Sequence, residues 1–146
     1  MKTKLLFLLA LAILSIPVQG QRYQPSEGTV YQTPKPELLK GIDGYFLNQE
    51  VLIKQVSVSH ENKLAYYIQE GDLLVTISKM DNHIRNIMKT YYSLTMYDNM
   101  LKTYTAMYGK PTYKTATLAV WRNSRQSLWI DRIGVKKCTL TLQSYD

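Results

Sequence analysis

The sequence predicts an α+β fold, in which one main helix packs on an antiparallel sheet. Two observations support this prediction. Residues 96–108 repeat apolar side chains with helical spacing and end just before a glycine and a proline. Residues 115–143 form short segments that are separated by polar turns, and the last segment alternates cleanly between apolar and polar residues. Such alternation is typical of an antiparallel sheet with one buried and one solvated face.

The helix predicted over 96–108 has clear signals at both ends. Thr95 can cap its N-terminus, and the Asp98 carboxylate suits the positive end of the helix dipole. Gly109 can adopt the left-handed conformation after the last turn, and Pro111 prevents continuation. One face is apolar and consists of Tyr97, Met100, Leu101, Tyr104 and Tyr108.

Three strands are expected after the helix, over residues 115–122, 127–132 and 137–143, with the last two connected by a turn at Gly134. The third strand should bury one side and expose the other. Its buried side consists of Cys138, Leu140 and Leu142, and its exposed side consists of Lys137, Thr139 and Thr141.

The first half of the chain has a similar but less regular pattern. Residues 64–69 and 73–79 are predicted as strands around a turn that contains Gly71. Residues 83–92 fit either a helix or a strand, and their isoleucines, threonine and tyrosines favour a strand. Residues 48–56 are predicted as either a short helix or a further strand.

Two short segments suggest an internal repeat. Leu64-Ala65-Tyr66-Tyr67 and Leu118-Ala119-Val120-Trp121 lie 54 positions apart, and each precedes a polar turn and two further predicted strands. If residues 48–56 are helical, the chain contains two tandem units of a helix and three strands. Chance similarity between short strands is the alternative explanation.

This layout, over Leu47 to Gln143, resembles that of small exported modules that pack a helical element on an antiparallel sheet. Examples are the β-lactamase inhibitor protein and the outer-membrane assembly lipoprotein family. The chain lacks the lipid-modified cysteine of the second family and an evident disulfide pattern, and no motif of either family is present. The resemblance implies binding to another protein and assigns no functional residue.

The chain is expected to be exported. Residues 1–20 have the lysines, short apolar core and small final residues of a secretory signal peptide, with cleavage expected between Gly20 and Gln21. Residues 21–40 read as a flexible, proline-rich leader, and residues 41–146 as a single α+β domain, with the folded part expected to begin near Leu38 or Gly41. We therefore expect a periplasmic or secreted protein without a transmembrane segment in its mature chain.

Positive charge is concentrated in the C-terminal half. Residues 99–145 contain eight basic residues and one acid, which suggests an anionic partner, with a solvated basic surface as the alternative. Basic and aromatic residues alternate there, and they predict a binding site at Arg122, Arg125, Trp129 and Arg132. Because the chain is expected to be exported, the predicted partner is a protein or an anionic envelope component, and no nucleic acid is expected.

The sequence contains few residues with catalytic or metal-binding patterns. His60 and His83 have no second ligand at metal-binding spacing, and Cys138 should be a buried, inert thiol. No catalytic residue, metal or cofactor is therefore predicted. The first hypothesis is an exported, non-enzymatic binding module. The alternative is a small secreted hydrolase of envelope material whose catalytic carboxylates the sequence does not identify, and the oligomeric state stays open.

Overall fold

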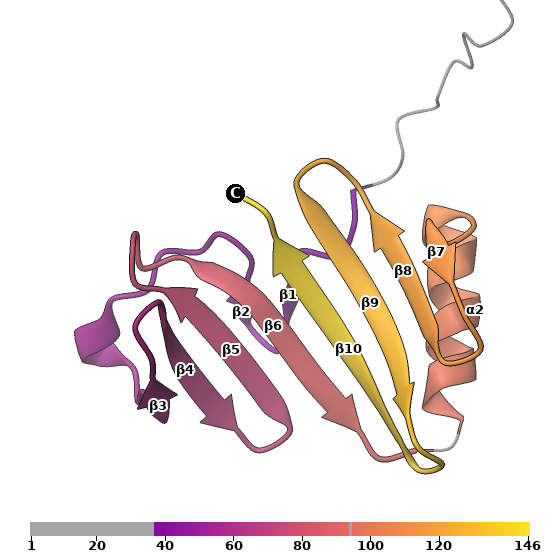
Figure 1. Cartoon of the computed structure of the whole chain (residues 1–146), viewed down its shortest axis with the longest axis horizontal. Coiled ribbons are helices and arrows are strands. Elements are labelled where there is room, and N and C mark those ends of the chain that lie inside the picture. The colour runs from indigo at the N-terminus through magenta and orange to yellow at the C-terminus, as the bar shows by residue number, and fades with distance from the viewer. Residues whose placement is uncertain (1–36, 94) are drawn as a thin grey trace, which may run out of the picture. The chain divides into compact units, whose positions relative to one another are not determined.

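The computed structural model of the chain describes residues 37–93 and 95–146. Within these residues, eight strands form one antiparallel sheet in the order β3-β4-β5-β6-β10-β9-β8-β7 (Figure 1). A separate pair, β1 (Gly41–Ile42) and β2 (Tyr45–Phe46), lies behind β6 and β10 in this view. The strands of the sheet are β3 (His60–Glu61), β4 (Ala65–Glu70), β5 (Leu73–Ser78), β6 (Ile84–Tyr91), β7 (Tyr113–Lys114), β8 (Leu118–Arg122), β9 (Gln126–Ile133) and β10 (Lys137–Ser144).

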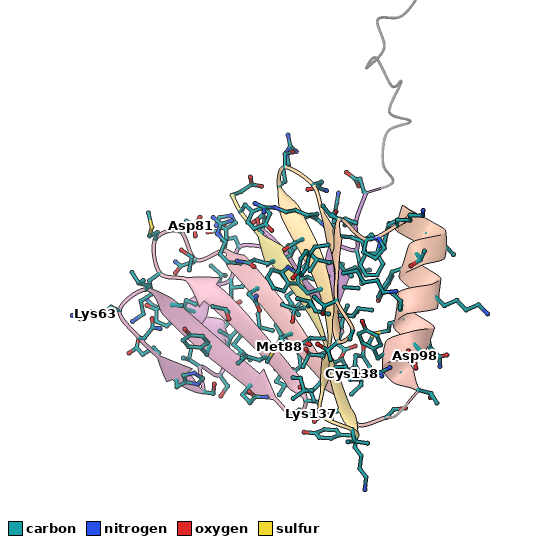
Figure 2. All side chains as sticks on the ribbon, turned by 45° about the vertical axis from the view of Figure 1, so that its right-hand side comes forward. Lys63, Asp81, Met88, Asp98, Lys137 and Cys138 are labelled. Carbon is teal, nitrogen blue, oxygen red and sulfur yellow. The ribbon has the colours of Figure 1, made fainter. Side chains whose placement is uncertain are left out.

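The predicted helix is confirmed as α2 (Met96–Tyr108), which packs against β9 and β10. Its apolar face points to the sheet: Tyr97 and Met100 are buried, and Leu101 is half-buried against the same core. Together, α2 and the sheet confirm the α+β class. Figure 2 shows side chains filling the space between helix and sheet. The labelled Asp98 lies on the helix, and the labelled Cys138 lies on the sheet.

The two ends of α2 differ from the expected caps. The side chain of Thr95 forms no capping hydrogen bond, because this residue already has helical dihedral angles of −97° and −11°. The predicted cap was therefore wrong. Gly109 has the positive φ expected at the other end, +79°, with ψ at −166°, and its N–H donates to Thr105 O. A side chain at this position would be strained.

The sheet consists of two halves with the same arrangement of strands. In each half a two-residue edge strand, β3 or β7, pairs with the first strand of a three-strand meander. The last strands of the two meanders, β6 and β10, pair with each other at the centre. The segments that the sequence repeats thus contribute to β4 and β8, which have equivalent positions in the two halves.

The repeat does not extend to the helix. Residues 48–56 form neither of the expected elements over their length, and contain the 3-10 turn η1 (Ile53–Gln55) and one isolated β-bridge, between Glu50 and His83. The reason lies in their backbone hydrogen bonds. Asn48 N donates to Ile84 O, and Val51 N donates to Asn82 O, both at 2.8 Å. These bonds hold the segment along the β5–β6 turn, so its amides cannot close an α-helix.

The other strand predictions are largely confirmed. The ambiguous segment 83–92 forms β6, as its β-branched and aromatic residues predicted. The strand expected from residue 115 begins at Leu118 instead. The hydroxyl of Thr115 accepts hydrogen bonds from the N–H groups of Thr117 and Leu118. Residues 115–117 therefore form a local turn before the strand.

The core lies between one face of the sheet and a layer made by α2 and residues 38–56. Cys138, Leu140 and Leu142 face it, as alternation predicted. Thr139 points the other way but is only 5% exposed, so the prediction of an exposed side was wrong for this residue. Side chains without exposed surface in this core are Val75, Ile77, Ile84, Ile87, Leu128, Ile130 and Leu142.

The fold begins within the segment predicted as a leader. Leu38 is 7% exposed and belongs to the core, and Leu39 O accepts a hydrogen bond from the Gln126 side chain at 3.1 Å. Of the two expected starts of the folded part, Leu38 already belongs to the core. The predicted signal peptide, and the leader as far as residue 36, lie outside the described residues.

The raised pKa values of two tyrosines predict a loss of stability at alkaline pH. The hydrogen bond from Tyr45 OH to the Glu70 carboxylate, 2.7 Å long, raises the pKa of Tyr45 to about 12, and burial raises the pKa of Tyr104 to about 12. Because both pKa values lie above the usual 10, the folded state holds these protons more tightly than the unfolded state. This stabilisation is complete below pH 10 and is lost as the pH rises to 12.

We expect the free energy of unfolding, measured by urea denaturation, to fall between pH 10 and pH 12. Tyr104→Phe removes one titrating group and should reduce this fall by about 2 kcal/mol. The comparison is between the two slopes, so a constant difference at neutral pH does not affect it. Equal slopes for the variant and the wild type would contradict the prediction.

Candidate functional site

One face of the sheet is not covered by any described helix or strand, and we call it the open face. The strand register places a row of mainly apolar side chains across it. A second row, beside the first, is polar. The apolar row contains Leu74, Met88, Thr141, Trp129, Val120 and Tyr113, and the polar row contains Thr76, Asn86, Gln143, Ser127 and Arg122.

The apolar row ends in a shallow groove of about 280 Å³ over β7, β8 and β9. Aromatic and aliphatic side chains form most of its surface, and Arg122 is its one charged residue. Since β7 contains only two residues, Tyr113 projects at the edge and is 58% exposed. The lining residues are Thr112, Tyr113, Leu118, Val120, Arg122, Trp129 and Tyr145.

Hydrogen bonds and stacking fix the side chains of this groove. The indole Nε1–H of Trp129 donates to Ser127 Oγ at 2.6 Å, and the residue is 37% exposed. The guanidinium of Arg122 lies 4.8 Å from the centre of the Tyr145 ring. The backbone N–H of Arg122 donates to Thr112 Oγ1 at 3.1 Å and holds the segment before β7 against β8. The groove is thus formed before any ligand binds.

The charge at the groove is positive at one end. Arg122 lies in the polar row, while Asp131 pairs in register with Leu118 at the other end of β8. No acidic residue lines the groove. Among the described residues, Arg132 is the one cation of segment 99–145 that forms an ion pair. Arg122 therefore has no acidic partner in the described part of the chain.

The structure brings together only two of the four predicted site residues. Arg122 and Trp129 both belong to the open face, and Arg125 lies in the turn between β8 and β9. Arg132 lies on the core side of the sheet, where it pairs with Asp98 at 2.9 Å.

The position of Arg132 follows from the alternation of side chains in a strand. It is two residues from the buried Ile130 and three from Trp129, so it must share the face of Ile130. Its guanidinium lies 4.6 Å from the centre of the Tyr97 ring and helps to hold α2 on the sheet. Arg132 therefore belongs to the helix–sheet contact and not to the groove.

Sequence reasoning missed several residues of the groove. Tyr113, Leu118 and Tyr145 come from three separate segments, which only the strand register brings together. Alternation along β8 could have indicated Leu118, because it shares a face with Val120 and Arg122. No local pattern identifies Tyr145 as the residue under Arg122.

Residues with reactive side chains lie away from the groove. Cys138 is 1% exposed, and burial raises the pKa of its thiol, so little reactive thiolate forms. His60 stacks on Tyr67 with 4.3 Å between ring centres, at the opposite edge of the sheet. Within residues 37–93 and 95–146, no three His, Cys, Asp or Glu side chains gather in a way that could hold a metal ion.

No helix in the described part of the chain is both long and apolar enough to cross a membrane. Comparison of the chain with models of known protein families, with curated proteins and with solved structures gives no match.

Proposed function

We propose that the chain is an exported, non-enzymatic binding module and that its open face binds an acidic protein. The observation that supports this most is the apolar row with its preformed aromatic groove, on a face that no described element covers. The N-terminal sequence pattern supports export. The layout resemblance to exported inhibitor and assembly modules supports a protein partner.

An uncovered face alone would not support binding, because antiparallel sheets often have one face in water. The composition of this face does support it. Trp, Tyr and Arg are enriched in protein interfaces and supply most of their binding energy. Here Trp129, Tyr145 and Arg122 lie together, and hydrogen bonds or stacking already hold them in place. Binding therefore needs little ordering of these side chains.

Charge and polarity favour an acidic protein over other partners. Seven of the eight cations of segment 99–145 form no ion pair with a described acid, so an acidic surface would be attracted to this half. A second copy of the chain would carry the same excess of positive charge. The amide groups of Asn86 and Gln143 and the guanidinium of Arg122 in the polar row can hydrogen-bond to a protein backbone.

A substitution at the centre of the open face tests this proposal. Thr141 lies between Met88 and Trp129 in the apolar row. Thr141→Arg should weaken partner binding by at least about tenfold, because a long side chain at the centre of the face would hold the two surfaces apart despite its attractive charge. The partner is first captured from envelope extract with the full wild-type chain and identified. Its affinity for each purified variant is then measured by calorimetry.

Thr103→Arg is the matched control, because Thr103 is exposed on α2, away from the open face. It should bind the partner as the wild type does, and both variants should unfold at the wild-type urea concentration. The affinity of the wild type should fall as salt increases. If Thr141→Arg binds as tightly as Thr103→Arg, the partner uses another surface and the proposal fails.

A further inference from the structure

We propose that the groove is an anchor site for an extended segment of the partner, in which an apolar side chain stands next to an acidic one. The apolar side chain would lie between Tyr113 and Trp129, and the carboxylate would bind Arg122. This inference rests on the proposed function and states which chemistry of the partner is recognised.

The groove is suited to an apolar side chain because aromatic and aliphatic groups form most of its surface, and two of its polar groups are already engaged. Trp129 Nε1 donates to Ser127, and Thr112 Oγ1 accepts from the Arg122 backbone. The volume of about 280 Å³ is just below the usual range of small-molecule pockets, roughly 300–1,000 Å³.

Arg122 is placed to bind the carboxylate. One face of its guanidinium stacks on Tyr145, and this orients the planar group. The N–H groups at the edge of an arginine fork remain able to donate two parallel hydrogen bonds to a carboxylate. Lys110 lines the adjoining hollow on the other side of Arg122 and adds positive charge. Asp131 lies toward the opposite end of the groove, so a carboxylate is attracted to the Arg122 end.

A test can use small peptides in place of the unidentified partner. The probe is N-acetyl-phenylalanyl-glutamic acid amide. It is compared with a glutaminyl analogue, in which glutamine replaces the glutamate, and an alanyl analogue, in which alanine replaces the phenylalanine. Binding to the full chain is followed by NMR through the indole N–H signal of Trp129. We expect the glutamyl probe to bind about fivefold more tightly than the glutaminyl probe, because the charged pair is lost in the second. The alanyl analogue should bind more weakly than both.

Variants assign this preference to the groove. Arg122→Gln should reduce the preference for the glutamyl over the glutaminyl probe to about one, while Lys102→Gln on α2 should keep it. Trp129→Ala, followed through backbone amide signals of β8, should remove binding of all three probes. An unchanged preference in Arg122→Gln would overturn the assignment of the carboxylate to this residue.

The outcomes also separate this inference from the proposed function. If no peptide binds but Thr141→Arg abolishes partner binding, the open face is the interface and the anchor site is wrong. If the peptides bind as expected but partner binding is insensitive to Thr141→Arg, the anchor site stands and the wider interface is wrong. Decanoate is the lipid control: if it binds through Trp129 and Arg122 while the peptides do not, the groove is a fatty-acid site and the proposal is overturned.

Discussion

Leu128→Ala is expected to lower the free energy of unfolding by about 2–5 kcal/mol, the range for leucines that are fully buried. Leu128 has no exposed surface. It lies at the centre of the sheet, where it pairs with Leu142 of β10 and Trp121 of β8. Rigid strands on both sides limit how far the structure can collapse around the lost atoms. We therefore expect a cavity, with its cost added to the lost transfer free energy.

Leu64→Ala is the control for this prediction. Leu64 is 75% exposed in the turn before β4, so the same chemical change should cost less than about 0.5 kcal/mol. Both values are measured by urea denaturation of the full chain. Equal losses for the two variants would mean that Leu128 is not in the core, and the strand register would then be wrong.

The elements with a strong local pattern were predictable from the sequence. The face of α2 repeats every three or four residues, and the alternation in β10 identifies the buried side of that strand without knowledge of its neighbours. Residues 48–56 could not be predicted in this way. Their conformation depends on hydrogen bonds to Asn82 and Ile84, which are distant in sequence and come close only in the folded chain.

The candidate site was predictable only in part, because it depends on how strands align. Trp129 and Arg132 are three residues apart in β9, so their side chains lie on opposite faces of the sheet. The prediction that placed both in one site did not take this alternation into account. Placing Arg122 over Tyr145 requires the alignment of β8, β9 and β10, which no local signal encodes. The concentration of cations in the second half was a correct observation, but the chain uses one of them, Arg132, to hold α2.

The two tryptophans provide a direct test of which side of the sheet is core. Trp121→Ala is expected to cost about 3–5 kcal/mol of stability, since large buried aromatic residues lose both contacts and volume. Trp121 is 2% exposed, and its indole N–H donates to Gly109 O at 2.9 Å, at the end of α2. Its ring also lies edge-on to Tyr104, with 5.9 Å between ring centres. The substitution therefore weakens the attachment of the helix to β8.

Trp129→Ala should cost about 1 kcal/mol or less, because its ring is partly exposed and its one hydrogen bond is to a neighbouring side chain. The same variant should bind the acidic partner at least about tenfold more weakly, as expected when an aromatic anchor is removed from an interface. If Trp121→Ala does not fold, Trp121→Phe keeps a buried six-membered ring and loses the smaller part of the indole together with its bond to Gly109. Urea denaturation and calorimetry on the same samples measure both effects.

A loss of stability in Trp129→Ala as large as that in Trp121→Ala would mean that both faces of the sheet are core in solution. The groove would then be filled by the chain itself, and the open face could not be the binding surface.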